Sequence, residues 1–166
     1  MQIEYRLAKP EELVQVFQLV SAAIHTMESQ NIYQWDEIYP NLKILEEDIQ
    51  KKQLYVGMIE NRIAVIYVLN QECDDAYENG NWKHKDKPFY VIHRLCVSPE
   101  FQNRGIAMQT MLYIEKKLQS MDIAAIRLDA YTQNPYSVRL YEKLGYDKVG
   151  FAEWRKGKFY LMEKYI

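Results

Sequence analysis

The stretch Gln102-Asn103-Arg104-Gly105-Ile106-Ala107 decides how this chain is interpreted. It joins an apolar run at residues 90–97 to an amphipathic run at residues 107–121, which predicts a strand, a short turn and a glycine loop that opens a helix. The first turn of a helix carries unpaired backbone N–H groups and the positive end of the helix dipole. Gly105 removes the Cβ that would hold an anion away from the backbone. The loop therefore predicts a site for a pyrophosphate group.

Before the apolar run at residues 90–97 the hydrophobic pattern predicts three strands and two helices. Apolar residues recur at three- and four-residue spacing over residues 13–27, which indicates a helix that begins near Pro10. Asn41 is placed to cap a second helix that begins at Leu42. The predicted strands are residues 3–7, 54–59 and 63–69, and the last two form a hairpin around residues 60–62.

The rest of the chain predicts an alternation of strands and helices. The strand at residues 90–97 is apolar on both faces apart from His93 and Arg94, as in a buried central strand. Asn134-Pro135 opens a helix that Gly145 ends. The other predicted segments are a functional or mobile loop at residues 70–88, a strand at residues 125–130, and a closing hairpin of residues 146–151 and 158–165. One domain is expected over residues 1–166.

Composition and charge describe an ordinary globular chain of 166 residues, of which 48% are apolar and 27% are charged. A formal charge of −2 gives no long-range attraction to nucleic acid or to an anionic membrane, so neither is expected as a partner. No signal peptide or membrane-spanning stretch is visible. Cys73 and Cys96 suit a reducing compartment, so the expected location is cytoplasmic. Their spacing from the three histidines predicts no metal site.

Three motifs, in this order, resemble the GNAT superfamily of acyl-CoA-dependent N-acetyltransferases. Residues 95–107 resemble the family's fourth strand and pyrophosphate loop, and Asn134 resembles the asparagine that follows its fifth strand. Leu140-Tyr141-Glu142-Lys143-Leu144-Gly145-Tyr146 is similar to the family's Leu-Tyr-Glu-Lys-Leu-Gly-Phe segment. The resemblance implies an α/β (α+β) fold with a mixed central β-sheet, splayed parallel strands four and five, and helices on both faces.

The resemblance also implies the reaction. Acetyl-CoA would bind as a co-substrate without a metal, and its acetyl group would pass by direct attack to a primary amine of a small molecule or of a peptide or protein terminus. The residues implied at the cofactor are Leu95, Cys96, Val97, Gln102, Asn103, Arg104, Gly105, Ile106, Ala107, Met108, Asn134, Ser137 and Tyr141. The Cys96 thiol is not expected to act as a nucleophile. A non-catalytic sensor or regulatory module that binds acyl-CoA is the alternative function.

Acyl transfer needs an acid for the leaving thiolate and a route for the proton of the amine. Tyr141 matches the family's acid, and its reference pKa of about 10 would keep it protonated. Its alternative role is that of a core aromatic residue. Asn134 is expected to cap a helix, to contact the cofactor, or to do both. Removing the amine proton requires a base or desolvation, because a lysine-like amine has a reference pKa of about 10.4.

His93 and Asp129 are the candidate bases. His93 is expected on the same strand face as Leu95 and Val97, and an unperturbed imidazole titrates near neutral pH. Its alternative is a core histidine that bonds to the backbone. Asp129 resembles in position a carboxylate used within the family, and its alternative is a salt bridge to Arg127 or to another neighbour.

The acceptor amine is expected to meet the segment between the first two helices. Tyr33, Trp35 and Tyr39 are the candidate walls there, with acidic residues nearby that would attract a cation. The alternative is that these aromatic side chains clamp the two helices onto the sheet. The sequence leaves the identity of the acceptor open. It also leaves open whether the protein forms a homodimer.

Overall fold

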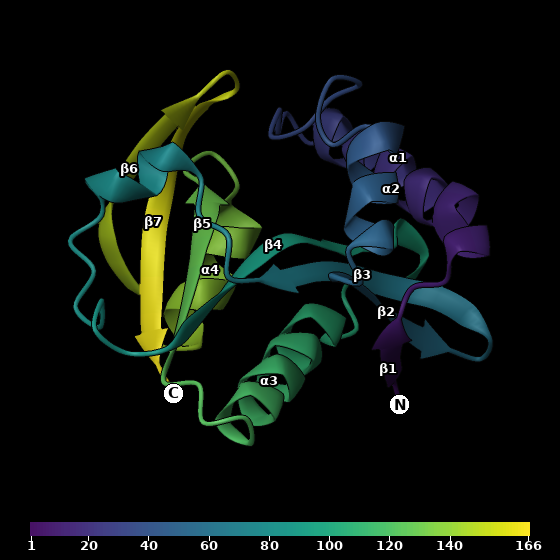
Figure 1. The fold of residues 1–166 in the computed structure, drawn as a ribbon. Helices are drawn as coiled ribbons and strands as arrows, with labels where there is room; N and C mark the ends of the chain where they lie inside the picture. The colour runs from purple at the N-terminus through teal and green to yellow at the C-terminus, as the bar shows by residue number, and fades with distance from the viewer. The chain divides into compact units, whose positions relative to one another are not determined.

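Seven strands and four α-helices follow one another in the order that the hydrophobic pattern predicts (Figure 1). The computed structural model describes all residues, 1–166. The strands are β1 (Glu4–Leu7), β2 (Leu54–Ile59), β3 (Arg62–Asn70), β4 (Phe89–Val97), β5 (Ala125–Tyr131), β6 (Asp147–Trp154) and β7 (Gly157–Tyr165). The helices are α1 (Leu13–Ser29), α2 (Leu42–Gln50), α3 (Ile106–Gln119) and α4 (Pro135–Lys143). None of these helices combines the length and the apolar character that crossing a bilayer requires.

The strands form a mixed sheet in the order β1-β2-β3-β4-β5-β7-β6. The β1–β2, β2–β3, β5–β7 and β6–β7 pairs are antiparallel, whereas β4 and β5 are parallel. The parallel ladder is short and pairs residues 89–91 of β4 with residues 125–127 of β5. A seven-stranded mixed sheet with parallel fourth and fifth strands confirms the predicted fold class.

By their internal contacts the residues fall into two compact units. The N-terminal unit comprises Met1–Leu69 and Arg94–Ala107, and the C-terminal unit comprises Asn70–His93 and Met108–Ile166. Strand β4 and helix α3 therefore each contribute residues to both units. The expectation of one domain stays a prediction.

In the N-terminal unit, α1 and α2 cover one face of the sheet (Figure 1). Side chains alternate along a strand, so Val65 and Ile66 of β3 point to opposite faces. Ile66 lies in the core beneath α1 and α2, whereas Val65 packs with Phe101 and Ile106 on the other face. The residues on either side of the glycine loop are therefore anchored in the core of this unit.

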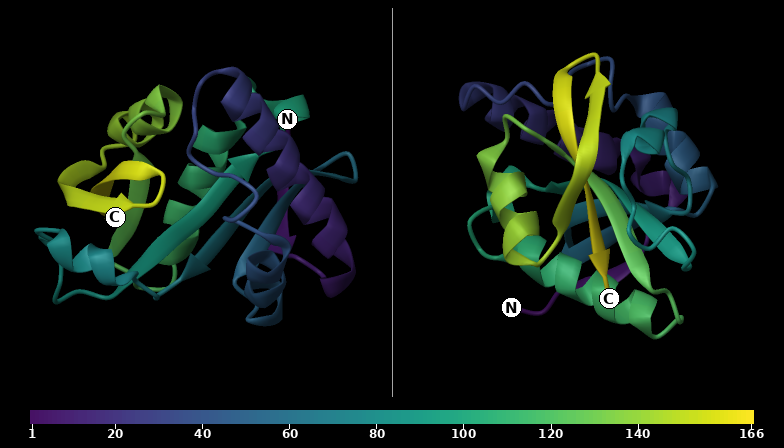
Figure 2. Two further views of the ribbon diagram at one scale, coloured as in Figure 1. Left: turned by 90° about the horizontal axis from the view of Figure 1, so that it is seen from above. Right: turned by 90° about the vertical axis from the view of Figure 1, so that its left-hand side faces the viewer.

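In the C-terminal unit, α4 lies beside β5, and the β6–β7 hairpin continues the sheet (Figure 2). A short 3-10 helix, η2 (Asp75–Asn79), packs on β6. Gly150 permits this approach, because a Cβ there would come within 2.8 Å of the backbone oxygen of Asn79. Tyr77 in η2 is 3% exposed. The polar stretch at residues 70–88 thus has a packed centre, although the sequence left a mobile loop as an alternative.

Local capping also follows the sequence. The side-chain oxygen of Asn41 accepts a hydrogen bond of 3.0 Å from the backbone N–H of Ile44, which confirms the predicted cap of α2. Gly145 has a φ of 91° and follows Leu144, the C-cap residue of α4, as expected of a residue that ends a helix. The observed bounds differ from the predicted ones by a few residues.

Candidate active site

The glycine loop is held from within the N-terminal unit by Phe101, which is 1% exposed and belongs to the short 3-10 turn η3 (Pro99–Phe101). The guanidinium of Arg104 lies 5.4 Å from the centroid of the Phe101 ring. The backbone is left-handed at Asn103, with a φ of 63°, and at Gly105, with a φ of 73°. A Cβ at Gly105 would meet no protein atom within 4 Å. The loop therefore faces open space, as an anion site requires.

The strand residues before this loop divide between two cores. Leu95 and Val97 are half-buried and pack with the cluster that contains Phe101. Cys96 points the other way into the core beneath α1 and α2. Burial raises the pKa of the Cys96 thiol to about 12. The thiol is therefore neutral near pH 7, which agrees with the prediction that it is not a nucleophile.

Arg94 interrupts the regular geometry of β4. Its φ is 52°, a left-handed conformation that a residue other than glycine rarely adopts within a strand. Side chains alternate between faces only where the backbone stays extended. The alternation that was expected to place His93 on the same face as Leu95 therefore does not apply across Arg94.

Asn134 caps helix α4. Its side-chain oxygen accepts hydrogen bonds from the backbone N–H groups of Tyr136, at 3.1 Å, and of Ser137, at 3.3 Å. The Ser137 hydroxyl donates to the backbone oxygen of Asn134 at 3.3 Å. The capping alternative is confirmed, and a contact of Asn134 or Ser137 with the cofactor stays a prediction.

Tyr141 is a buried residue of α4, with 7% of its surface exposed. Its ring meets the ring of Tyr146 edge to face, with the centroids 5.9 Å apart. The Tyr141 hydroxyl makes no hydrogen bond to another protein group. Burial raises the pKa of Tyr141, and the charge of Asp129 raises it further. Tyr141 is therefore a neutral donor at any pH near neutrality.

Asp129 of β5 accepts a hydrogen bond from a buried tyrosine. The hydroxyl of Tyr77 donates to Oδ2 of Asp129 at 2.7 Å. Of the predicted alternative, a salt bridge to Arg127 or to another neighbour, the Arg127 partner is not found: its guanidinium lies over the rings of Trp82 and Phe89, 4.4 and 3.8 Å from their centroids. Asp129 is half-buried and lies close enough to Tyr141 for its charge to influence that phenol.

His93 is paired with a side chain. Its Nε2 lies 2.8 Å from Oδ1 of Asn70, the last residue of β3. The same oxygen accepts the backbone N–H of Glu72 at 3.0 Å. Oδ1 has no proton to give, so the contact requires Nε2 of His93 to be the donor. One partner of this histidine is thus an amide side chain.

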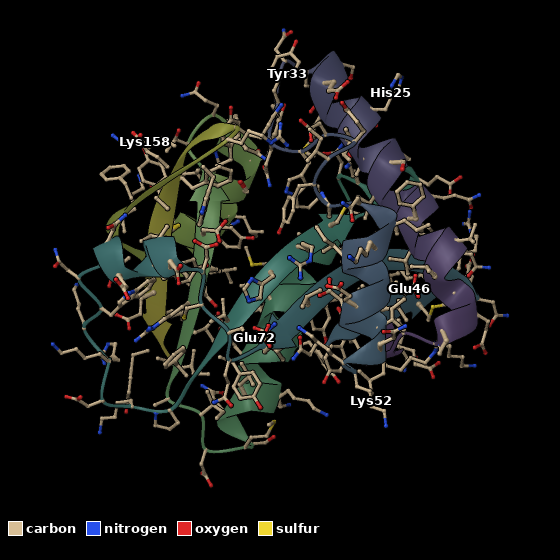
Figure 3. The ribbon with its side chains drawn as sticks, turned by 45° about the horizontal axis from the view of Figure 1, so that its top comes forward. His25, Tyr33, Glu46, Lys52, Glu72 and Lys158 are labelled. Carbon is tan, nitrogen blue, oxygen red and sulfur yellow. The ribbon has the colours of Figure 1, made fainter.

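The three predicted acceptor residues differ in exposure. Tyr33 is 49% exposed and lies beyond the end of α1 (Figure 3), where its hydroxyl donates to the side-chain oxygen of Asn31 at 3.2 Å. Tyr39 is 38% exposed. Trp35 is buried in the core with α1 and α2, which favours the clamping alternative for this residue.

One buried side chain in each unit has a charged partner that the sequence did not predict. Asp48 of α2 is buried and forms an ion pair with Arg94, and Tyr77 is buried against Asp129. A signal for Asp48 does exist, because it lies three residues after Leu45 and directly before Ile49, on the apolar face of its helix. Tyr77 has no such signal, since it lies in a polar stretch.

The match to a family model now defines the class of this protein. The model described as "Acetyltransferase (GNAT) family" matches residues 24–146. The chain belongs to this family and is an acyl-CoA N-acetyltransferase.

Three individual proteins illustrate the likeness. A GNAT family acetyltransferase from Streptococcus agalactiae 2603 has a TM-score of 0.85 and 22% identity, over 99% of this chain and 95% of its own. PaiA N-acetyltransferase from Thermoplasma acidophilum, solved in complex with coenzyme A, has a TM-score of 0.73 and 19% identity, over 100% of both chains. The S-(2-succino)cysteine N-acetyltransferase of Bacillus subtilis (strain 168) is 21% identical, over 95% of this chain and 92% of its own.

Proposed function

We propose that this protein transfers the acetyl group of acetyl-CoA directly to a primary amine of a small molecule or of a peptide or protein terminus. The observation that carries the proposal is the hydroxyl of Tyr141, which is part of a buried side chain and makes no hydrogen bond within the protein. A phenol in this state is available to donate to a leaving group.

The loop supports the first step, the binding of the donor. The N–H groups of residues 103–108 would surround the pyrophosphate, and Arg104 would add a positive charge near it. The open space at Gly105 supports this role. Backbone groups of Leu95 and Val97 would hold the pantetheine arm, and an N–H of this strand would stabilise the oxyanion.

The chemical step moves two protons. The neutral amine nitrogen attacks the thioester carbon, the carbon–sulfur bond breaks, and the sulfur departs as a thiolate. Tyr141 would donate a hydrogen bond to this thiolate. Because its pKa is raised, Tyr141 would give its proton to the sulfur only as the nitrogen of the product amide loses a proton. The amine proton ends in water, the thiolate gains one proton, and Tyr141 is restored.

Asp129 is better supported than His93 as the group that receives the amine. Its carboxylate lies near Tyr141 and is held by Tyr77. A carboxylate would attract the cationic amine and help to pass its proton to water. Nε2 of His93 already bonds to Asn70.

Tyr33 and Tyr39 are our proposed contacts for the acceptor, because both are exposed in the segment between α1 and α2. The name of the Bacillus subtilis relative supports testing amino-acid amines first. The free cysteines support a cytoplasmic location. Whether the protein forms a homodimer stays open.

The test measures release of the free thiol of coenzyme A with a panel of amino acids, polyamines and peptides. The proposal expects turnover with at least one amine, and loss of that turnover in Tyr141→Phe with coenzyme A affinity unchanged. Protein that binds acetyl-CoA but turns over no amine would favour the sensor alternative.

A further inference from the structure

Arg94, the left-handed residue of β4, is also the centre of a hydrogen-bond fork that is buried at its Asp48 end. The Nε and Nη2 atoms of Arg94 donate to the two carboxylate oxygens of Asp48 at 2.8 and 2.7 Å. The Nη1 atom donates to the Tyr39 hydroxyl at 2.7 Å. The side chains of Arg94 and Asp48 are only 12% and 8% exposed. All three residues belong to the N-terminal unit.

Burying two charged side chains costs desolvation free energy, so net stability does not by itself explain the Arg94–Asp48 pair. Desolvation raises the pKa of Asp48 despite the neighbouring guanidinium. Desolvation also acts to lower the pKa of Arg94, but Tyr39 and Asp48 outweigh it and the pKa is raised. Arg94 is therefore charged throughout the working pH range. Buried ion pairs of this kind are best attested as devices that fix one geometry rather than as sources of net stability.

The Tyr39 end of the fork is itself ordered. The side chain of Asp36 accepts hydrogen bonds from the backbone N–H groups of Ile38, at 3.0 Å, and of Tyr39, at 3.3 Å. The backbone N–H of Asp36 donates to the backbone oxygen of Tyr39 at 3.0 Å. Residues 36–39 thus form a closed turn, and Arg94 fixes this turn to β4.

Leu95 follows Arg94 in the chain, so the left-handed backbone of Arg94 sets the direction in which β4 enters Leu95. A left-handed conformation costs a residue other than glycine about 1–2 kcal/mol, so it persists only where its surroundings enforce it. Two hydrogen bonds to Asp48 and one to Tyr39 supply this enforcement. The conformation of β4 just before Leu95 and the place of Tyr39 are therefore set by one side chain.

We infer that Arg94 is a positioning residue that couples the acceptor wall at Tyr39 to the strand that handles the acyl group. The inference rests on the proposed function, in which Leu95 meets the thioester and Tyr39 meets the amine. In this inference Arg94 itself touches neither substrate: three of its five N–H groups donate to Asp48 and Tyr39, and it acts through them. We therefore expect the binding of coenzyme A along β4 to reduce the motion of the turn at residues 36–41.

The kinetic test compares Tyr39→Phe with a matched control, Arg6→Gln. Arg6 also forms a two-bond ion pair, with Glu12 at 2.8 Å for each bond, in the same unit. We expect Tyr39→Phe to raise the KM for the amine about tenfold, as for a lost hydrogen bond to a charged group, with the KM for acetyl-CoA unchanged. Arg6→Gln should lower the melting temperature and leave both KM values unchanged. An unchanged amine KM in Tyr39→Phe would overturn the inference.

A second comparison separates the backbone from the side chain. Arg94→Gly removes the fork but tolerates a φ of 52°. Arg94→Ala removes the fork and no longer enforces that φ. We expect the coenzyme A affinity of the glycine variant to stay within about threefold of the wild type and that of the alanine variant to fall further. Equal affinities in these two variants would contradict the role assigned to the backbone.

A third measurement needs no amine, so it separates this inference from the proposed function. Hydrogen exchange of residues 36–41 is followed with and without coenzyme A. Binding should slow this exchange in the wild type and in Arg6→Gln, but not in Tyr39→Phe. Equal slowing in Tyr39→Phe, or none in wild type that binds coenzyme A, overturns the coupling. Absence of turnover with every amine, beside intact coupling, would instead count against the proposed function alone.

Discussion

The hydroxyl of Tyr77 donates a 2.7 Å hydrogen bond to Oδ2 of Asp129, across 52 residues of sequence. Tyr77 is fixed in turn by Trp82, whose ring stacks on it with centroids 5.4 Å apart and whose Nε1 donates to its backbone oxygen at 2.7 Å. The polar stretch between β3 and β4 therefore contributes a donor to a carboxylate that lies near Tyr141. A segment without hydrophobic periodicity helps to build the proposed catalytic side of the C-terminal unit.

The first prediction concerns this hydrogen bond. Tyr77→Phe keeps the ring and its packing but removes the donor to Asp129. Hydrogen bonds to charged groups contribute about 1.5–3 kcal/mol, so we expect kcat/KM for the amine to fall about 10- to 100-fold. Steady-state kinetics would measure this, and titration calorimetry should find coenzyme A affinity unchanged. A variant with normal kinetics would show that Asp129 does not need this donor.

The second prediction separates acid from packing at Tyr141. Tyr141→Phe should lower kcat by about 100- to 10,000-fold, the usual contribution of a general acid, with little change in melting temperature. Because burial raises the pKa of Tyr141, its ionisation should give no alkaline limb in the pH profile of kcat/KM below about pH 10. The control is Tyr146→Phe, which removes the hydroxyl of the neighbouring ring. Full activity in Tyr141→Phe would show that Tyr141 serves only as a core aromatic residue.

The third prediction uses the two thiols. Cys73 is exposed, whereas Cys96 is buried and its pKa is raised by burial to about 12. A thiol reagent at pH 8 should therefore label one cysteine in the folded protein and both in denaturant, because only the thiolate reacts. Peptide mapping should place the first label on Cys73. Rapid labelling of Cys96 in folded protein would contradict the burial described above.

The fourth prediction concerns stability in acid. Hydrogen bonds from Arg6 hold the pKa of Glu12 below its usual value of 4.5, and a bond from the backbone N–H of Lys9 acts in the same direction. A lowered folded pKa gives stability that is present above the unfolded pKa and is lost as the pH falls through the folded pKa. Glu12→Gln should therefore be less stable at pH 7 by about 1 kcal/mol, and the difference should shrink below about pH 4. Urea unfolding at both pH values measures it; a constant difference would contradict the lowered pKa.

Local signals in the sequence predicted most of the fold. The caps at Asn41 and Asn134 bond as expected, because a cap depends on residues two or three positions away. The glycine loop lies between a strand and a helix as predicted, because hydrophobic periodicity defines both elements. The even alternation expected along β4 is interrupted by the left-handed Arg94.

Long-range partners were beyond such reasoning. Arg94 and Asp48 are 46 residues apart, and nothing near either residue in the sequence identifies the other. The burial of Trp35 and the exposure of Tyr33 and Tyr39 depend on how the turn after α1 folds back, although all three residues are aromatic. Contacts between residues far apart in the sequence can be identified only from the tertiary structure, whereas the helices and strands that carry these residues can be predicted from the sequence.

The central claim is that the glycine loop binds the pyrophosphate of coenzyme A. Gly105→Glu is the most direct test, because a Cβ there meets no protein atom within 4 Å and the cost to the fold is the backbone strain of a φ of 73°. Gly145→Ala is the control, since it strains another glycine of positive φ, 91°, outside the loop. Titration calorimetry should find coenzyme A binding to the wild type and to Gly145→Ala, and binding to Gly105→Glu weakened by more than about tenfold through repulsion between the new carboxylate and the phosphates. No binding by folded wild type, or equal affinity in Gly105→Glu, would contradict the account.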